Sequence, residues 1–180
     1  MTIVAVTGHR SLTDAAGIRQ SIATVLSTVE RPLIGITALA AGADQLFADV
    51  VLGLGGELHV IVPGRDYRAA LPARARAAFD RYLAAATTVT TLEIAVVNTD
   101  AYLAAGLAML DRCDLLVAVW DGEASRGVGG TADLVRRAHE RGTEVRVIPA
   151  TRPSRRSSER RAHRGHHHRR TGGGSQATEQ

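Results

Sequence analysis

The chain has 180 residues, of which 45% are apolar and only 3% aromatic, so one domain with an aliphatic core is expected. No apolar run reaches the roughly 18–20 residues that span a bilayer, and the first residues lack the basic start and cleavage site of a signal peptide. The single cysteine, Cys113, excludes an internal disulfide and a multi-cysteine metal site. These features predict a cytoplasmic protein without a membrane partner.

Charge divides the chain near residue 150. Residues 1–150 contain 14 arginines and 16 acidic residues, a net charge of −2, whereas residues 151–180 contain 8 arginines and 2 acidic residues, a net charge of +6. Apolar residues are scarce after residue 150, so this segment cannot bury enough surface to offset its ordering entropy. The sequence therefore predicts a folded domain over residues 1–150 and a disordered basic tail, rich in Arg, His and Gly, over residues 151–180.

Strand-like and helix-like segments alternate along residues 1–150. Apolar runs predict strands at 3–7, 33–39, 58–62, 87–92, 115–120 and 144–148. Helices are predicted at about 14–29, from 43 to the glycines at 53–56, and at about 73–85, 100–110 and 132–141. This alternation predicts an α/β fold, a Rossmann-like doubly wound, mainly parallel sheet with helices on both faces. Because such sheets bind ligands outside the carboxyl ends of their strands, the loops after the strands contain the candidate site.

The glycine-rich loop at 126–133 gives the strongest signal. It follows the buried strand at 115–120 and opens a helix, and its glycines let successive backbone N–H groups point at one spot. The helix start adds partial positive charge, and the hydroxyl of Thr131 can bind a phosphate or cap the helix. Gly129, Gly130 and Thr131 are therefore predicted to bind phosphate or ribose, with a flexible loop before a capped helix as the alternative.

Two earlier loops are also candidates for the site. Small residues around Gly42 allow a ligand to approach the backbone, and Asp44 either contacts that ligand or complements the dipole of the following helix. After the first strand come Gly8, His9 and Arg10. Arg10 is predicted to clamp a phosphate. His9 is predicted to donate to a phosphate or to act as an acid or base. An ordinary surface loop is the alternative.

The strand at 115–120 ends in Trp120-Asp121-Gly122. Asp121, with Gly122 beside it, is predicted to hold ribose hydroxyls or to act as a catalytic carboxylate. Trp120 either stacks on a base or packs in the core. After the third predicted strand, Tyr67 and Arg68 are predicted to form a lid over the site.

No metal site is predicted in the folded part. His59 lies within a predicted strand and His139 lies on a predicted helix, and neither has a partner at metal-ligand spacing.

These loops together resemble the SLOG superfamily of Rossmann-like domains. The stretch 37–44, with Gly55-Gly56 before the next strand, is similar to the nucleotide-binding domain of DNA-processing protein A. The stretch 112–133 is similar to proteins related to the Lonely Guy phosphoribohydrolases. The resemblance covers about residues 3–149. It implies a ligand such as a nucleotide, a nucleotide sugar or an NAD-derived signal, which some members cleave and others only bind, and it implies a homodimer as one assembly.

The sequence departs from the hydrolases of this superfamily at their catalytic position. Their loop reads Pro-Gly-Gly-x-Gly-Thr, with a catalytic Glu three residues after the Thr. Here Arg126 and Val128 replace the Pro and the second Gly, and Leu134 stands in the Glu position. Asp133 is one residue away, which is about 100° around a helix. The resemblance thus implies nucleotide binding, and Asp121 and Asp133 are the candidate catalytic carboxylates if the protein is an enzyme.

The basic tail allows three interpretations. It has no role beyond solvation, or its arginines contact the phosphates of a nucleic acid or an acidic partner, or its histidines weakly bind Zn or Ni. The third is disfavoured because the histidines have no cysteine or carboxylate at ligand geometry. The histidines of the tail are His163, His166, His167 and His168.

The leading hypothesis is a sensor or binding module for a nucleotide or nucleotide-derived ligand, NAD-derived compounds included. One alternative is a hydrolase or transferase that acts on the N-glycosidic bond of nucleotides. The other is a protein that binds single-stranded DNA through the tail. No further cofactor is predicted.

Overall fold

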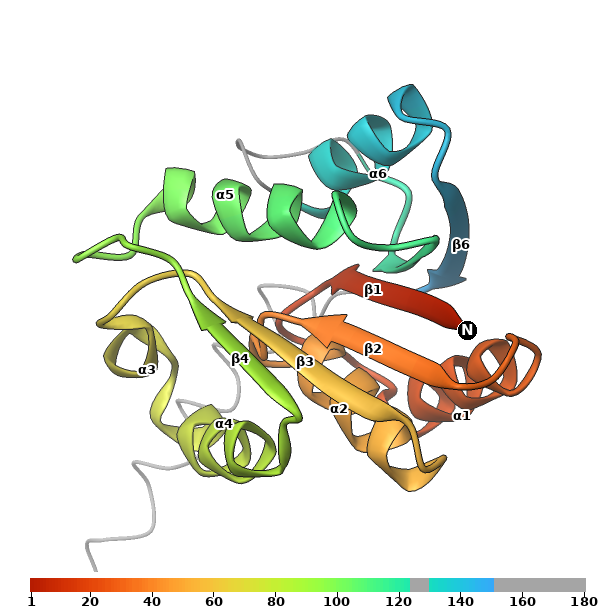
Figure 1. The fold of residues 1–180 in the computed structure, drawn as a ribbon, viewed down its shortest axis with the longest axis horizontal. Helices are drawn as coiled ribbons and strands as arrows, with labels where there is room; N and C mark the ends of the chain where they lie inside the picture. The colour runs from red at the N-terminus through yellow and green to blue at the C-terminus, as the bar shows by residue number, and fades with distance from the viewer. Residues whose placement is uncertain (124–129, 151–180) are drawn as a thin grey trace, which may run out of the picture.

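The computed structural model of the chain describes residues 1–123 and 130–150. Within these residues, six strands form one sheet in the order β4-β3-β2-β1-β5-β6 (Figure 1). All neighbouring strands are parallel. The strands are β1 Thr2–Gly8, β2 Leu33–Thr37, β3 Glu57–Val62, β4 Thr88–Thr91, β5 Leu115–Trp120 and β6 Glu144–Pro149. The predicted α/β fold with a parallel sheet is confirmed.

Helices cover both faces of the sheet. The helices are α1 Ala15–Ser27, α2 Ala43–Gly53, α3 Tyr67–Ala70, α4 Ala73–Ala85, α5 Thr99–Leu110 and α6 Thr131–Glu140. In Figure 1, α1, α2 and α4 lie below the sheet, and α5 and α6 lie above it. Side-chain caps define two of the starts: Asp14 accepts from the Gly17 N–H and Asn98 from the Ala101 N–H, both at 2.9 Å. The short helix α3 was not predicted from the sequence.

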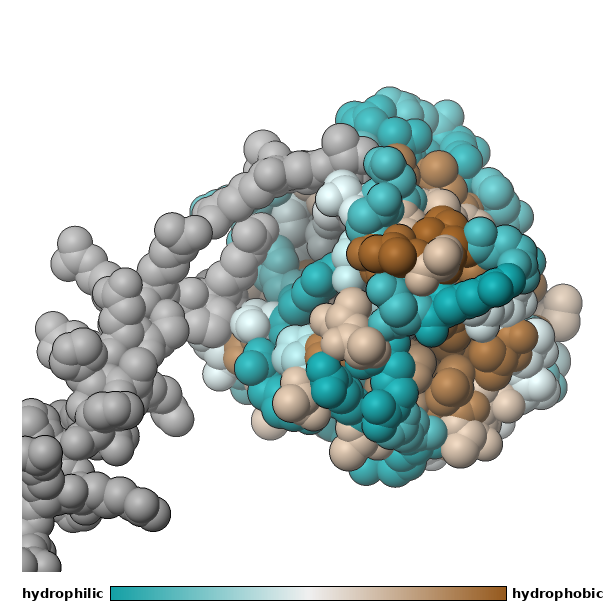
Figure 2. Space-filling view, turned by 90° about the vertical axis from the view of Figure 1, so that its left-hand side faces the viewer, coloured by the Kyte–Doolittle hydropathy of each residue, from teal (hydrophilic) through white to brown (hydrophobic). Residues whose placement is uncertain are grey.

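The order of the strands reverses between β1 and β5. From β1 the chain adds β2, β3 and β4 in one direction, and it then returns to pair β5 with the other side of β1. The loops that leave β1 and β5 therefore diverge to opposite faces, which opens a crevice at their carboxyl ends. Figure 2 views the molecule from this side, where polar residues are interspersed with apolar ones.

Each face of the sheet has its own apolar layer. Because side chains alternate along a strand, Val4 and Val6 of β1 pack toward α1 and α2, whereas Ala5 packs toward α5 and α6. Phe47 of α2 is fully buried in the first layer, and its ring lies against Gly35, where an added Cβ would approach the ring within 3.0 Å. In the described residues, no helix combines the length and apolar character that crossing a membrane requires.

The predicted strand at 33–39 ends earlier than expected. The hydroxyl of Thr37 accepts a hydrogen bond from the Leu39 N–H at 3.0 Å, and Leu39 adopts φ = 57°. This local turn removes residues 38 and 39 from the sheet and directs the chain toward α2. The difference matters because the turn forms part of the candidate site.

The core layer under α2 gives a first prediction. Replacing Phe47 by Ala leaves a cavity between α2 and the sheet, so the free energy of unfolding falls by about 3–5 kcal/mol. Val96 is 68% exposed, and Val96→Ala is the control, with an expected change within about 0.5 kcal/mol. Urea unfolding of the intact chain measures both. A loss as small for Phe47→Ala as for Val96→Ala would contradict this placement of the core.

Candidate ligand-binding site

The end of β1 is held closely between two other elements. A Cβ added to Gly8 would lie 2.5 Å from the Cβ of Ala43 in α2 and 2.8 Å from the Cβ of Val119 in β5. Side-chain atoms do not approach so closely, so only glycine permits this packing. The start of α2 is therefore seated directly at the point where the strand order reverses.

Gly42 brings the second loop against the first. It has φ = 84°, and an added Cβ would lie 2.4 Å from the carbonyl oxygen of His9. The Ala43 N–H donates to that same oxygen at 3.1 Å. The left-handed conformation of the buried Leu39 lies in the same loop. Backbone conformations of this kind are costly for residues with side chains, and they concentrate where structure serves a site.

The loops line a cavity of about 120 Å³ that opens to solvent at the carboxyl ends of the strands. Its walls come from β1 and its loop, the β2–α2 loop, α3, α5 and the start of α6. Among the lining residues are Gly8, Arg10, Asp44, Tyr67, Tyr102, Gly130 and Thr131. The structure thus brings together predicted site residues from three separate loops.

Asp44 is the buried carboxylate of this cavity. Only 6% of its surface is exposed, and its Oδ2 accepts hydrogen bonds from the Thr37 hydroxyl at 3.1 Å and from the Ala40 N–H at 3.3 Å. Burial raises the pKa of Asp44 to about 6, although these hydrogen bonds and the positive charge of Arg10 act in the opposite direction. Its protonation therefore changes near neutral pH.

Arg10 lies over an aromatic ring at the cavity wall. Its guanidinium carbon is 4.4 Å from the ring centroid of Tyr102, a cation–π contact that orients the group while leaving its N–H donors available. Among the described residues, no carboxylate forms an ion pair with Arg10. A guanidinium held in this way is suited to bind an anion.

His9 and Asp121 pair with each other. The Nε2 atom of His9 lies 3.2 Å from the Asp121 backbone nitrogen and 3.1 Å from its Oδ2. A neutral ring can accept from that N–H, whereas a ring protonated at Nε2 can donate to the carboxylate. The pair joins the ends of β1 and β5, and neither residue lines the 120 Å³ cavity. Asp121 instead borders a separate hollow beside Asp14 and Ala150.

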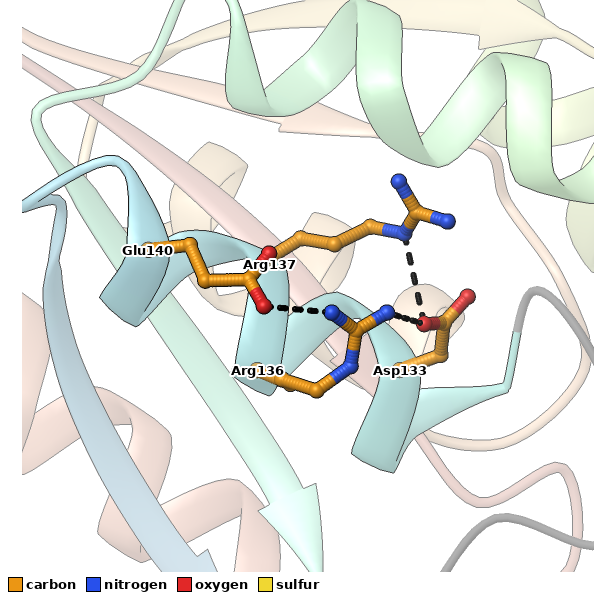
Figure 3. A network of polar contacts seen from close by, with 4 residues as sticks. All are labelled: Asp133, Arg136, Arg137 and Glu140. Carbon is orange, nitrogen blue, oxygen red and sulfur yellow. Dashed lines mark hydrogen bonds and ion pairs between the residues drawn. The ribbon is translucent and has the colours of Figure 1, made fainter.

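Asp133 is held by arginines of its own helix (Figure 3). Its Oδ1 accepts from the Nη2 of Arg136 and, at 3.3 Å, from the Nε of Arg137, and Arg136 also pairs with Glu140. Asp133 does not line the cavity. Its geometry is that of a stabilising helix ion pair, and the spacing of three and four residues could have indicated this from the sequence.

The remaining predicted residues differ in their placement. Gly129 lies outside the described residues. Gly122 has φ = 80°, and a Cβ added there would meet no atom of the described residues within 4 Å. The Nε1 of Trp120 donates to the carbonyl oxygen of Glu123 at 3.0 Å, and its ring packs against the α5–α6 layer, which agrees with the core alternative for this residue.

The predicted lid takes a different form. Tyr67 is buried and forms part of the cavity wall, whereas Arg68 is exposed and binds Asp80 through two contacts of 2.7 Å. Sequence reasoning missed Tyr102, whose only signal was its position in the first turn of the helix after β4. In the described part of the chain, no group of three or more His, Cys, Asp or Glu is arranged to hold a metal ion.

The raised pKa of Asp44 predicts a pH-dependent stability. The folded pKa of about 6 lies above the ordinary value of 3.8, so the folded state binds the proton more tightly than the unfolded state. Ionised Asp44 therefore costs stability above about pH 6, and this cost disappears as the pH falls through 6 toward 3.8. The difference reaches about 3 kcal/mol.

Asp44→Asn isolates this effect because the amide has the same shape and does not ionise. Urea unfolding at about pH 8, 6 and 4 compares the two chains. We expect the stability of the wild type to rise relative to that of the variant as the pH falls. A difference that stays constant with pH would show that Asp44 titrates as an exposed carboxylate.

Comparison with known proteins shows similarity of fold. The sequence matches no protein-family model and no curated protein. DNA processing protein A from Streptococcus pneumoniae superposes with a TM-score of 0.62 at 20% identity, covering 84% of this chain and 51% of that one. This chain thus spans about half the length of that protein.

Two further solved structures are similar. DNA processing protein A from Helicobacter pylori, described for its single-stranded DNA binding mode, gives a TM-score of 0.63 at 15% identity, with 91% of this chain and 73% of that one covered. A molybdenum cofactor binding protein from Rippkaea orientalis gives 0.51 at 13% identity, with 90% and 83% covered. The chain therefore shares the Rossmann-like fold of these solved structures.

Proposed function

We propose that the protein binds a nucleotide or a nucleotide-derived ligand at the carboxyl ends of β1 and β2, and acts as a sensor or binding module. The observation that carries this proposal is the combination of groups around one cavity. An arginine without a carboxylate partner among the described residues, a helix start and a buried carboxylate line the same 120 Å³ space.

The phosphate of the ligand is assigned to Arg10 and the start of α6. Gly130 and Thr131 line the cavity, and the first N–H groups of a helix have no partner within the helix. Partial positive charge at the helix start and the fixed charge of Arg10 both favour an anion. Gly130 also has no side chain that caps the helix, so a phosphate oxygen can take that place.

The size of the cavity supports a division of the ligand. A cavity of about 120 Å³ that opens to solvent has room for a sugar, and the remaining parts of a nucleotide can extend beyond it. A neighbouring hollow of about 370 Å³ also has Arg10 in its wall, together with Gly42 and Arg74. We assign the ribose to the small cavity, the phosphate to the vicinity of Arg10, and the rest of the ligand to the outer hollow.

Cleavage of an N-glycosidic bond is the alternative function. It requires a carboxylate beside the bound sugar. Asp44 lines the cavity. The two predicted catalytic carboxylates do not, because Asp121 pairs with His9 and Asp133 pairs with two arginines. This arrangement favours binding over the predicted catalysis by Asp121 or Asp133. Release of adenine from AMP, lost in Asp121→Asn with binding retained, would support the enzyme instead.

The role of Arg10 gives a direct test of the proposal. We expect the full chain to bind ribose 5-phosphate, measured by isothermal titration calorimetry. Replacing Arg10 by Ala removes charge-assisted hydrogen bonds to the phosphate, so Kd should rise by about ten- to a hundredfold.

Arg19→Ala is the matched control for this test. Arg19 lies on α1, pairs with Asp49 and does not line the cavity, so its replacement should leave Kd unchanged. If neither ribose 5-phosphate nor AMP, ADP-ribose or inorganic phosphate binds to the folded chain, the proposal is wrong.

Single-stranded nucleic acid is the second candidate ligand. The description of the Helicobacter pylori protein as a binder of single-stranded DNA and the net charge of +6 over residues 151–180 both favour it. Residues 151–180 lie outside the described part of the chain. One truncation therefore tests both the predicted domain boundary and the role of the tail.

Truncation after Ala150 tests the nucleic-acid alternative. The Ala150 N–H donates to the Trp120 carbonyl oxygen at 3.0 Å, so the cut preserves the contacts of β6. We expect the truncated chain to keep the melting temperature and ribose 5-phosphate affinity of the full chain, and to lose affinity for oligothymidylate measured by fluorescence anisotropy. Undiminished oligothymidylate binding would assign that interaction to the folded domain.

A further inference from the structure

Tyr67 lines the cavity with a side chain whose hydroxyl group is buried. The residue is 1% exposed, and its Oη has no hydrogen-bond partner among the described residues. Edge-on contacts with Phe79 and Tyr102, at centroid distances of 5.8 and 6.0 Å, hold the ring in place. Because these contacts hold the ring, the side chain cannot move to bring its hydroxyl to another partner.

A buried hydroxyl without a partner costs stability, whereas phenylalanine would supply the same packing without that cost. The residues around this hydroxyl indicate a role in ligand binding. Tyr67, Asp44 and Arg10 all line the cavity. Burial, with Asp44 as a lesser contributor, raises the pKa of Tyr67 well above its usual range. The group is therefore a neutral phenol at physiological pH, able both to donate and to accept a hydrogen bond.

Asp44 supplies a matching acceptor. Its hydrogen bonds from Thr37 and Ala40 both end on Oδ2, the Ala38 backbone also interacts with the carboxyl group, and a carboxylate has about four acceptor sites in all. Asp44 can therefore accept a further hydrogen bond from a ligand in the cavity.

The charges around the cavity select the chemistry of the group that enters it. The carboxylate of Asp44 repels a phosphate, and the neighbouring guanidinium of Arg10 repels a cation. A neutral group that carries hydroxyls, such as a sugar, is compatible with both, and the cavity of about 120 Å³ has room for it.

We propose that Asp44 and Tyr67 together recognise two adjacent hydroxyl groups of the bound sugar, which makes the site selective for ribose over 2-deoxyribose ligands. The 3-hydroxyl donates to Asp44, and the neighbouring 2-hydroxyl exchanges a hydrogen bond with the Oη of Tyr67. A 2-deoxy sugar leaves the Tyr67 hydroxyl without a partner, and this loss is the source of the selectivity. The inference rests on the proposed binding of a nucleotide-derived ligand.

The test uses the full chain and two sugars that differ by one hydroxyl. Isothermal titration calorimetry measures Kd for ribose 5-phosphate and 2-deoxyribose 5-phosphate, with inorganic phosphate as a third probe. We expect the wild type to prefer the ribose compound by about tenfold or more. Tyr67→Phe should weaken ribose 5-phosphate binding until the two sugars bind with affinities within about threefold of each other, with little change for 2-deoxyribose 5-phosphate or phosphate.

Tyr82→Phe is the matched control. Tyr82 is also a buried tyrosine, but its hydroxyl accepts from Arg81 at 2.7 Å and it does not line the cavity. This variant should keep the full preference for ribose. Thermal melting without ligand gives an independent readout. Tyr67→Phe should melt at or above the temperature of the wild type, because the lost hydroxyl has no partner in the part of the chain that the structure describes.

The outcomes separate this inference from the proposed function. Equal binding of both sugar phosphates by the wild type, or an unchanged preference in Tyr67→Phe, overturns the inference and leaves the proposed function in place. An equal loss of affinity for both sugars in Tyr67→Phe also overturns it, because it points to a water-mediated or purely structural role. Failure of every sugar phosphate and of inorganic phosphate to bind overturns both.

Discussion

The contact between the β1–α1 and β2–α2 loops is the constraint on which the site depends. Gly8 leaves room for α2 to begin against the end of β1, and Gly42 takes a left-handed conformation with the His9 carbonyl oxygen directly against it. The hydrogen bond from the Ala43 N–H to that oxygen closes the junction. As a result, Arg10 and Asp44, which are 34 positions apart in the sequence, line one cavity. A side chain at either glycine would force the two loops apart, so the same packing that completes the sheet also builds the site.

The buried polar groups of the cavity lower the stability of the folded domain. Burial of Asp44 raises its pKa to about 6, and the hydroxyl of Tyr67 has no partner among the described residues. Apolar residues at both positions would make the fold more stable. The polar residues found there therefore indicate a functional site. Arg10 moderates the first cost through its charge and is itself held over Tyr102. A ligand that supplied hydroxyls to the interior and a phosphate to Arg10 would satisfy all three groups at once.

Most of the fold could be predicted from the sequence, because the apolar runs of the buried strands and the helical spacing between them are local signals. The run 115–120 coincides with β5. The cavity could be predicted only in part. Glycines and charged residues directly after β1 and β2 were recognised, but the approach of Tyr102 depends on how α5 packs over the sheet, which no local pattern encodes. The role of Asp133 was ambiguous in the sequence. A carboxylate that serves a glycine-rich loop and one that pairs with Arg136 are distinguished only by the position of the helix.

We propose that the junction of these loops binds a sugar phosphate, and a two-dimensional amide NMR titration of the full chain with ribose 5-phosphate tests this site. We expect the changes in chemical shift to concentrate at residues 8–10, 40–44 and 130–131, around the cavity, with smaller changes at Tyr67 and Tyr102. Changes confined to other surfaces, or spectra that do not change at millimolar ligand, would show that the junction is not the binding site.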